Sequence, residues 1–290
     1  MQLPGGRTLG YAVFGTGARV VLWFHGTPGG RRQVPPAARR FADEHGVRVI
    51  GVERPGIGDS TPHLYANLRE FADDVARLLE QLSIERCAVV GLSGGGPYAL
   101  ACAHALPQVE ACGVLGGVAP SCGPEAVKGG VSTLARLAPG VAPIRRPLGA
   151  LISMTIRAAH PIASPGYDLF KRLCREPDRA VFEAPGIKRM FLDDMLQGSR
   201  AGLHSLVYDY LLFSRPWGFS IAEVRVPTHF WHGDADAFVP LEHGRHQAAL
   251  VRGSTLTVQP GQSHLGGLMI AGEVLTKVLG EASDPAPVVP

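Results

Sequence analysis

The sequence of 290 residues lacks the long apolar runs and the one-sided charge that mark membrane-spanning and nucleic-acid-binding proteins. Its longest apolar runs, such as residues 20–24, fall far short of the roughly 20 residues that a spanning helix needs. The 28 lysines and arginines nearly balance 25 aspartates and glutamates, so the formal net charge is only +3. We therefore expect no membrane span, no nucleic-acid partner and a small molecule as the substrate, while the oligomeric state stays open.

Cysteine is also scarce, with five residues in a chain large enough to fold around a core without disulfides. Cys87, Cys102 and Cys112 lie within or beside apolar stretches, where a free thiol behaves as a small hydrophobic group. Two glycines and Arg7 precede any apolar stretch, so no secretory signal is indicated. These features predict buried, unpaired cysteines and a cytoplasmic location.

What the sequence does contain is a regular alternation of short β-branched runs with helical patterns. Asn67 is a credible cap for one of the helices. The alternation predicts the α/β class, with a mostly parallel sheet flanked by helices. The expected strands are residues 19–24, 47–52, 87–90, 109–115, 228–232 and 255–258, and the expected helices are residues 33–45, 67–82, 97–106, 241–251 and 265–279.

The alternation is interrupted in the middle of the chain, where strand signals vanish and Pro and Gly recur. We predict a core domain formed by residues 1–120 and 218–280, an inserted helical cap (lid) at residues 121–217, and a mobile tail at residues 281–290. Apolar stretches of the cap are expected to line an apolar pocket or to pack. Asp193 and Asp194 in the cap could bind a substrate ammonium group, but a solvated helix face is the favoured interpretation.

The strongest chemical signal is G-L-S-G-G at residues 91–95, which follows an expected strand and precedes an expected helix. Glycines two residues before and after the serine let strand and helix approach closely and present the hydroxyl outward. Ser93 is therefore the predicted nucleophile. An ordinary glycine turn is the alternative.

A serine hydroxyl needs a base, and His264 is the favoured one among eleven histidines. It follows the last expected strand, at the edge of the sheet where the sites of open α/β folds lie. His243 and His246 share an expected helix, where solvent exposure is favoured over a metal pair. His232 closes a strand, where packing or turn support is expected.

The acid that orients the histidine should follow the preceding strand, in H-G-D-A-D-A-F-V-P at residues 232–240. Asp234 comes directly after the turn and could cap it, which is a structural use of aspartate. Asp236 lies further into the loop and is favoured. The resulting chain order is Ser93, Asp236, His264.

An oxyanion needs fixed donors, and we expect an oxyanion hole formed by the backbone N–H groups of Thr27 and Gly94. Gly94 follows the serine at the start of a helix. Thr27 lies in the turn after the first core strand, and Pro28 beside it has no N–H to offer. The Thr27 hydroxyl is a candidate for an additional donor.

Five motifs in order, H-G-T-P-G (25–29), R-P-G-I-G-D-S (54–60), G-L-S-G-G, the aspartate loop and G-Q-S-H (261–264), resemble those of the α/β-hydrolase superfamily. The resemblance covers about residues 7–120 and 217–280 and implies the α/β-hydrolase fold. It maps Ser93, Asp236 and His264 onto the catalytic triad. The first two motifs resemble those of proline iminopeptidase-like members. Those enzymes carry a glycine where this chain has Thr27 and an aromatic residue where it has Gly94.

The sequence thus predicts a serine hydrolase that acts on a small, partly hydrophobic carboxylic ester through an acyl-enzyme, without a metal or organic cofactor. Three alternatives stay open. They are a proline iminopeptidase-like aminopeptidase, an enzyme of the same fold with other chemistry such as a perhydrolase or carbon–carbon bond hydrolase, and a non-catalytic ligand-binding protein.

Overall fold

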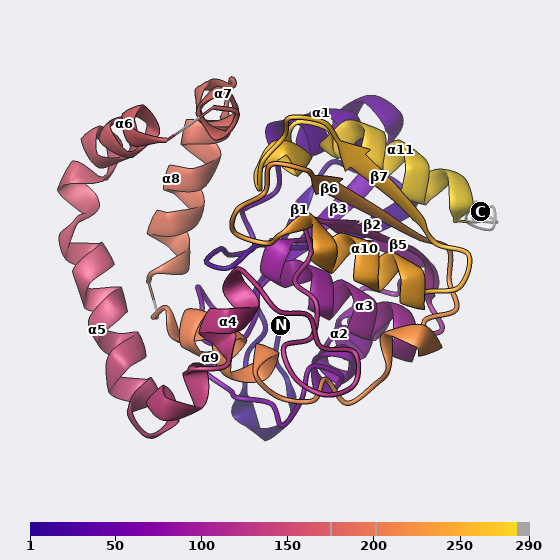
Figure 1. Ribbon diagram of the computed structural model, residues 1–290, viewed down its shortest axis with the longest axis horizontal. Helices are drawn as coiled ribbons and strands as arrows, with labels where there is room; N and C mark the ends of the chain where they lie inside the picture. The colour runs from indigo at the N-terminus through magenta and orange to yellow at the C-terminus, as the bar shows by residue number, and fades with distance from the viewer. Residues whose placement is uncertain (175, 201, 283–290) are drawn as a thin grey trace.

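The computed structural model describes residues 1–174, 176–200 and 202–282, and a seven-stranded sheet lies at its centre (Figure 1). The strand order is β1-β3-β2-β4-β5-β6-β7, and only β1 runs antiparallel to its neighbour. This arrangement confirms the predicted mostly parallel α/β fold. The strands are β1 Tyr11–Phe14, β2 Arg19–Phe24, β3 Val47–Val52, β4 Cys87–Leu92, β5 Val109–Leu115, β6 Thr228–Gly233 and β7 Thr255–Gln259.

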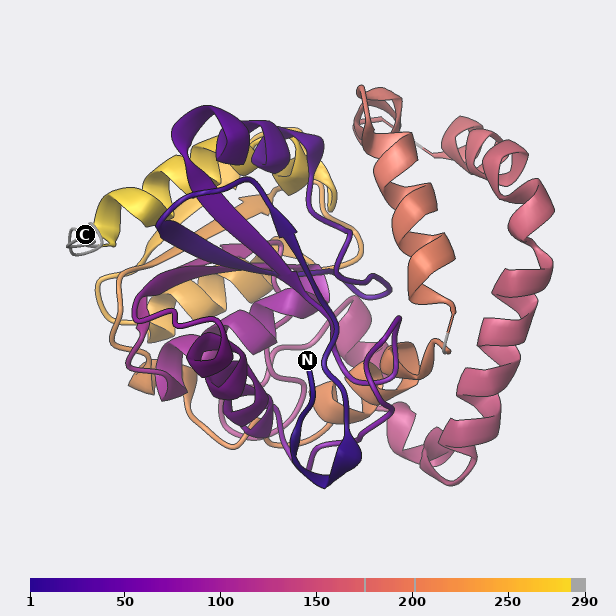
Figure 2. The same cartoon turned by 180° about the vertical axis from the view of Figure 1, so that it is seen from behind.

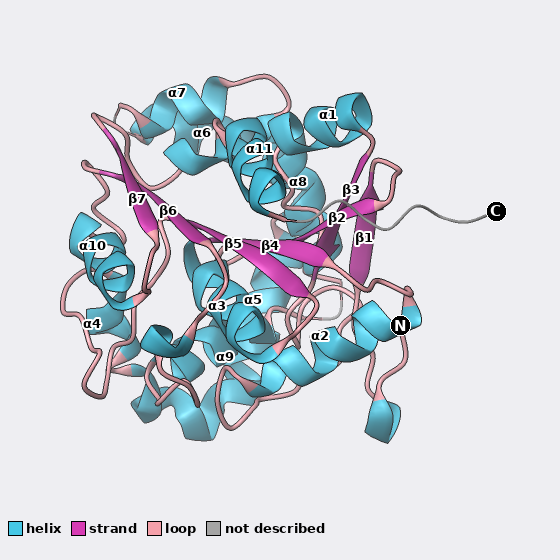
Figure 3. Ribbon diagram, turned by 90° about the vertical axis from the view of Figure 1, so that its right-hand side faces the viewer, coloured by secondary structure: helices cyan, strands magenta, loops and turns pink. Residues whose placement is uncertain are grey.

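Helices cover both faces of the sheet (Figure 3). Helices α1 (Pro36–His45) and α11 (Ala271–Glu281) cover one face, and α2 (Glu70–Gln81), α3 (Gly96–Ala105) and α10 (Leu241–Leu250) cover the other. Successive side chains of a strand point to opposite faces. Accordingly Val20, Leu22 and Phe24 of β2 join the apolar core below α2 and α3, whereas Val21 and Trp23 join the core below α1 and α11.

The predicted elements are present, and the largest differences lie at helix starts and at the sheet edge. Helix α1 begins at Pro36, three residues later than expected, because proline is favoured in the first turn of a helix. Asn67 accepts a hydrogen bond from the Glu70 N–H at 3.3 Å, although α2 itself begins only at Glu70. The last helix is split into a short turn, Gly266–Leu268, and α11. Strand β1 was not predicted, since it has only four residues on an edge and no clean alternation of burial.

The segment from 121 to 217 contains helices and no strand among its described residues, apart from one isolated bridge between Leu203 and Ile57. Helices α5, α6, α7 and α8 form an arm beside the sheet, and α9 lies at its base, where it packs against α5 (Figures 1 and 2). The helices are α4 Val131–Ala135, α5 Arg145–Ala158, α6 Ala163–Leu173, α7 Asp178–Glu183, α8 Ile187–Gly198 and α9 His204–Phe213, joined by 3-10 turns at Ala138–Ile144 and His160–Ile162.

Two further expectations concern membrane crossing and the C-terminal tail. No helix among the described residues combines the length and the apolar character needed to cross a bilayer. Glu281 ends α11, and residues 283–290 of the predicted mobile tail lie outside the described part of the chain.

Candidate active site

Ser93 lies at the junction between β4 and α3, with its backbone in the left-handed region at φ +53°. This conformation is costly for a residue with a side chain and is maintained only by its surroundings. The flanking glycines are required sterically. A Cβ on Gly91 would lie 2.4 Å from the carbonyl oxygen of Gly95, and a Cβ on Gly95 would lie 2.2 Å from that of Phe24. The close approach expected of these two glycines is therefore present.

The structure brings the side chains of Ser93, His264 and Asp236 together at the carboxyl ends of neighbouring strands. The Nε2 atom of His264 lies 2.8 Å from Ser93 Oγ, and its Nδ1 atom lies 2.7 Å from Asp236 Oδ2. Ser93 follows β4, Asp236 follows β6 and His264 follows β7. Since the three strands are parallel, the loops after them meet at one edge of the sheet.

The Asp236 carboxylate is held by several donors. Its Oδ1 atom accepts the N–H groups of Phe238 and Val239 at 2.9 and 2.8 Å, which leaves Oδ2 for His264. His232 lies behind it, with Nε2 3.5 Å from Oδ2. Burial alone would raise the pKa of Asp236, but hydrogen bonding to His232 and His264 lowers it well below its ordinary value. An ionised Asp236 favours the His264 tautomer with the proton on Nδ1, so Nε2 is free to accept the serine proton.

The other candidates from the sequence have structural partners. Asp234 accepts the Gly261 N–H at 2.7 Å and ties the loop after β6 to the loop after β7. The expected exposure of His243 is wrong, because this side chain is fully buried and its Nδ1 accepts the Ala119 N–H at 3.0 Å. Burial lowers the pKa of His243 to about 4. His246 is partly buried. Among the described residues, no group of three or more histidine, cysteine or acidic side chains is arranged to hold a metal ion.

Two aromatic rings lie close to residues of the site. The Phe238 ring lies 5.7 Å from the His264 ring, centre to centre, and its side chain is 65% exposed. Phe213 at the end of α9 lies next to Gly94, where its Cζ atom would be 3.3 Å from an added Cβ. Phe213 is itself only 1% exposed, so of these two rings Phe238 is the one open to a ligand.

Thr27 and Gly94, the predicted oxyanion donors, lie in contact. A Cβ on Gly94 would lie 2.2 Å from Thr27 Oγ1, so the threonine side chain occupies the space that a side chain at position 94 would need. The N–H of Gly26 donates to Gln33 Oε1 at 2.6 Å. The N–H of Thr27, by contrast, donates to no acceptor among the described residues. The backbone of Thr27 is therefore available to a ligand.

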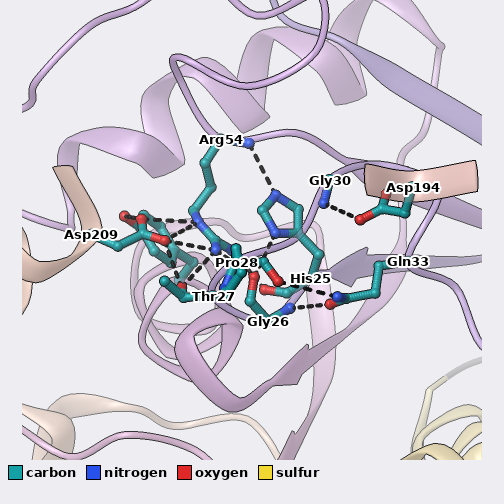
Figure 4. Close-up of polar contacts among 10 residues, drawn as sticks. His25, Gly26, Thr27, Pro28, Gly30, Gln33, Arg54, Asp194 and Asp209 are labelled. Carbon is teal, nitrogen blue, oxygen red and sulfur yellow. Dashed lines mark hydrogen bonds and ion pairs between the residues drawn. The ribbon is translucent and has the colours of Figure 1, made fainter. Parts of the chain in front are cut away.

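The Thr27 hydroxyl does not serve as the additional oxyanion donor that was considered. It donates its single proton to Asp209 Oδ2 at 2.6 Å and accepts a hydrogen bond from Arg54 Nη2 at 2.9 Å (Figure 4). Arg54 and Asp209 are each 1% exposed and form an ion pair beneath the loop that carries Thr27. Sequence reasoning missed both roles. A lone aspartate in the apolar stretch L-V-Y-D-Y-L-L-F was the available signal, because a charge placed among buried residues must find a partner.

Asp194 corrects both interpretations offered for it. It is 4% exposed, so it is not on a solvated face. It accepts the N–H group of Gly30 at 2.8 Å (Figure 4) and that of Arg32 at 3.0 Å, so it is not free to bind an ammonium group. Burial raises its pKa to about 6, against the lowering effect of these two hydrogen bonds. Asp193 pairs with Arg32 Nε at 2.5 Å. Both acids thus contact the segment that follows β2.

Comparisons with known proteins agree with this fold. A family model described as the alpha/beta hydrolase fold matches residues 19–128. A proline iminopeptidase from Arabidopsis thaliana is 36% identical over 101 residues, which cover 34% of this chain and 26% of that protein. The matched segment therefore spans about a quarter of this relative's length.

Solved structures match over nearly the whole chain. An esterase from Thermogutta terrifontis has a TM-score of 0.66 at 25% identity and covers 96% of this chain and 95% of its own. An esterase from Exiguobacterium antarcticum has a TM-score of 0.64 at 20% identity and covers 97% of both chains. The sheet, the family model over residues 19–128 and these structural similarities together show that the chain has the α/β-hydrolase fold.

Proposed function

We propose that the protein is a serine hydrolase that cleaves carboxylic esters through an acyl-enzyme. Ser93 is the nucleophile, His264 is the general base and acid, and Asp236 orients the imidazole. The observation that carries this proposal is the continuous chain of hydrogen bonds from Ser93 Oγ through His264 to Asp236, which begins at a serine with φ +53°. Such a constellation is the recurring arrangement of nucleophilic acyl transfer.

In the first half of the reaction, Ser93 Oγ attacks the ester carbonyl carbon while its proton passes to Nε2 of His264. The carbonyl π electrons move to oxygen, and the N–H groups of Thr27 and Gly94 stabilise the negative charge that develops there. The tetrahedral intermediate then collapses. Its bond to the alcohol oxygen breaks, and the alcohol leaves with the proton from His264.

In the second half, a water molecule transfers a proton to His264 and attacks the acyl carbon. The same two N–H groups stabilise the second tetrahedral intermediate. Its collapse breaks the bond to Ser93 Oγ, which regains its proton from the imidazole, and the carboxylic acid is released. Asp236 stays ionised throughout and stabilises the imidazolium that forms twice in each turnover.

We propose a small, partly hydrophobic ester as the substrate and residues 121–217 as a cap over the core. The exposed ring of Phe238 beside His264 supports an apolar substrate. Asp193 and Asp194 are engaged by the segment after β2, and this engagement favours an uncharged ester over a substrate ammonium. The expected cytoplasmic location belongs to the same proposal.

A proline iminopeptidase-like aminopeptidase is the second candidate, because a third of the chain is similar to such an enzyme. The contact between Thr27 and Gly94 weighs against it. Thr27 occupies the space where those enzymes place an aromatic side chain after the serine, so the two departures from their pattern are linked sterically. The pocket beside the nucleophile is consequently different in shape.

The test is a panel of p-nitrophenyl esters of increasing acyl length, measured beside prolyl and alanyl arylamides with the wild type and Ser93→Ala. We expect turnover of short or medium esters that Ser93→Ala abolishes, with weak or no turnover of the arylamides. Stronger hydrolysis of the arylamides would favour the aminopeptidase. Absence of both activities, together with failure of a fluorophosphonate to label Ser93, would favour the ligand-binding protein and overturn the proposal.

A further inference from the structure

The loop that carries Thr27 is fastened to the helical segment by a buried ion pair. Asp209 comes from α9, and Arg54 follows β3. Nη2 of Arg54 lies 2.7 Å from Asp209 Oδ2, and Nε lies 3.0 Å from both carboxylate oxygens. Tyr98 donates its hydroxyl proton to Oδ1 at 2.7 Å. Two opposite charges buried this deeply are stable only when they stay paired with each other, so the pair fixes the position of the groups bonded to both.

The hydrogen bonds of this pair end on three successive residues of the loop (Figure 4). Arg54 donates to the carbonyl oxygens of His25 at 2.6 Å and Gly26 at 2.8 Å, and Asp209 accepts the Thr27 hydroxyl at 2.6 Å. The carbonyl of Gly26 and the N–H of Thr27 belong to the same planar peptide group and point in opposite directions. A hydrogen bond that fixes the carbonyl therefore also fixes the direction of the N–H.

A second buried carboxylate of the helical segment holds the other end of the same loop. Asp194 of α8 accepts the N–H groups of Gly30 and Arg32, and Gln33 closes the loop on itself by accepting from Gly26 and donating to the Pro28 carbonyl at 3.2 Å. Helices α8 and α9 thus each contribute one carboxylate to residues 25–33.

We propose that Asp209, through Arg54, is a positioning residue for the oxyanion hole, and that Asp194 supports the same loop from its far end. The cap then has a second task besides covering the substrate, because it completes the site that stabilises the transition state. This inference rests on the proposed function. A misdirected Thr27 N–H weakens stabilisation of the oxyanion, which forms only during reaction, and leaves binding of the uncharged ester nearly unchanged.

The test compares Asp209→Asn with Tyr98→Phe, which also removes a hydrogen bond from the Asp209 carboxylate but leaves its contacts with Arg54 and Thr27. We expect Asp209→Asn to lower kcat by roughly 10- to 100-fold with KM within about threefold, since loss of a whole oxyanion donor costs about 10²–10³. Affinity for a trifluoromethyl ketone, which forms a tetrahedral adduct with the serine, should fall by a similar factor. Tyr98→Phe should change kcat, KM and the affinity for the trifluoromethyl ketone by less than about fivefold each.

The final stoichiometry of fluorophosphonate labelling separates positioning from mere stability, because it counts correctly folded sites. A kcat loss that only matches a loss of labelled sites, or a change confined to KM, would overturn the inference. If Asp209→Asn does not fold, Arg54→Lys decides by the same readouts, since lysine keeps the charge but cannot reproduce the planar fork of donors. Failure of the proposed function would appear separately, as an inactive and unlabelled wild type.

Discussion

On one side of Ser93, His264 and Asp236 come from loops that directly follow neighbouring strands, and the three side chains meet through two short hydrogen bonds. On the other side, Thr27 lies on a loop held by Asp209 and Asp194, which come from helices α9 and α8 outside the sheet. The His264 side is therefore carried by loops that directly follow strands of the sheet, whereas the loop that carries Thr27 depends on carboxylates from helices α8 and α9. The two sides should respond differently to mutation and to pH.

The largest effect is expected from removing the hydrogen-bond chain on the His264 side. Ser93→Ala and His264→Ala should each lower ester turnover by roughly 10⁴- to 10⁶-fold, because neither nucleophile nor base can be replaced by a neighbour. Steady-state kinetics with a p-nitrophenyl ester and circular dichroism of the folded variants provide the measurement. Activity within about tenfold of the wild type in either variant would remove that residue from the mechanism.

The second largest effect is expected in a comparison of the two aspartates in the loop after β6. Asp236→Asn should lower kcat by about 10⁴-fold, because an amide favours the His264 tautomer that cannot accept the serine proton. Asp234→Asn is the matched control and should stay within about tenfold of the wild type, since an asparagine oxygen can still accept the Gly261 N–H. The reverse ranking in kcat would transfer the role of the acid to Asp234.

The same contrast explains what the sequence could predict. Each strand and the polar loop that follows it are adjacent in the sequence. The sheet could therefore be predicted from local patterns, and so could the contact between His264 and Asp236. Arg54 and Asp209 are 155 residues apart in the chain, and Thr27 and Asp209 are 182 apart. No local periodicity encodes such a pairing. Only the cost of burying an unpaired carboxylate in an apolar helix pointed to a partner, without saying which.

Acid stability offers a third test, through the buried histidine below the His264 side. The pKa of His243 is about 4 in the folded protein because burial disfavours its charged form, against an ordinary value of 6.5. The unfolded chain therefore binds one more proton between these values, so the free energy of unfolding falls as the pH falls from 6.5 to 4. Over this whole pH range, the loss in the free energy of unfolding is on the order of 3 kcal/mol.

His243→Asn isolates this contribution, because asparagine can still accept the Ala119 N–H but does not titrate. Asp194 works in the opposite direction on the Thr27 side. Its pKa is raised to about 6, so its contribution to the free energy of unfolding increases as the pH falls from 6. The wild type and His243→Asn are compared by denaturant titrations from pH 7 to 4. The free energy of unfolding should fall more steeply with pH in the wild type, by up to about 1.4 kcal/mol per pH unit. Parallel curves would mean that His243 titrates normally.

The smallest effect is expected at exposed hydrophobic side chains of residues 134–173. Of the thirteen large hydrophobic side chains that are exposed in the described residues, nine lie between residues 134 and 173, and Leu137 and Leu173 are 72% and 75% exposed. They lie on helices α4 to α6 and the turns that join them, whereas the contacts with the Thr27 loop come from α8 and α9. Leu137→Gln and Leu173→Gln should therefore change the free energy of unfolding by less than about 0.5 kcal/mol.

Leu211→Ala in α9 is the matched comparison, because Leu211 is 1% exposed and lies two residues after Asp209 in the same helix. It should cost about 2–5 kcal/mol, and it should also lower kcat if α9 positions the loop after β2. Denaturant titration and ester kinetics measure the two consequences. Equal effects of the Leu137 and Leu211 variants would show that residues 121–217 respond as one uniform body, and the distinction between helices α4 to α6 and helices α8 and α9 would have to be abandoned.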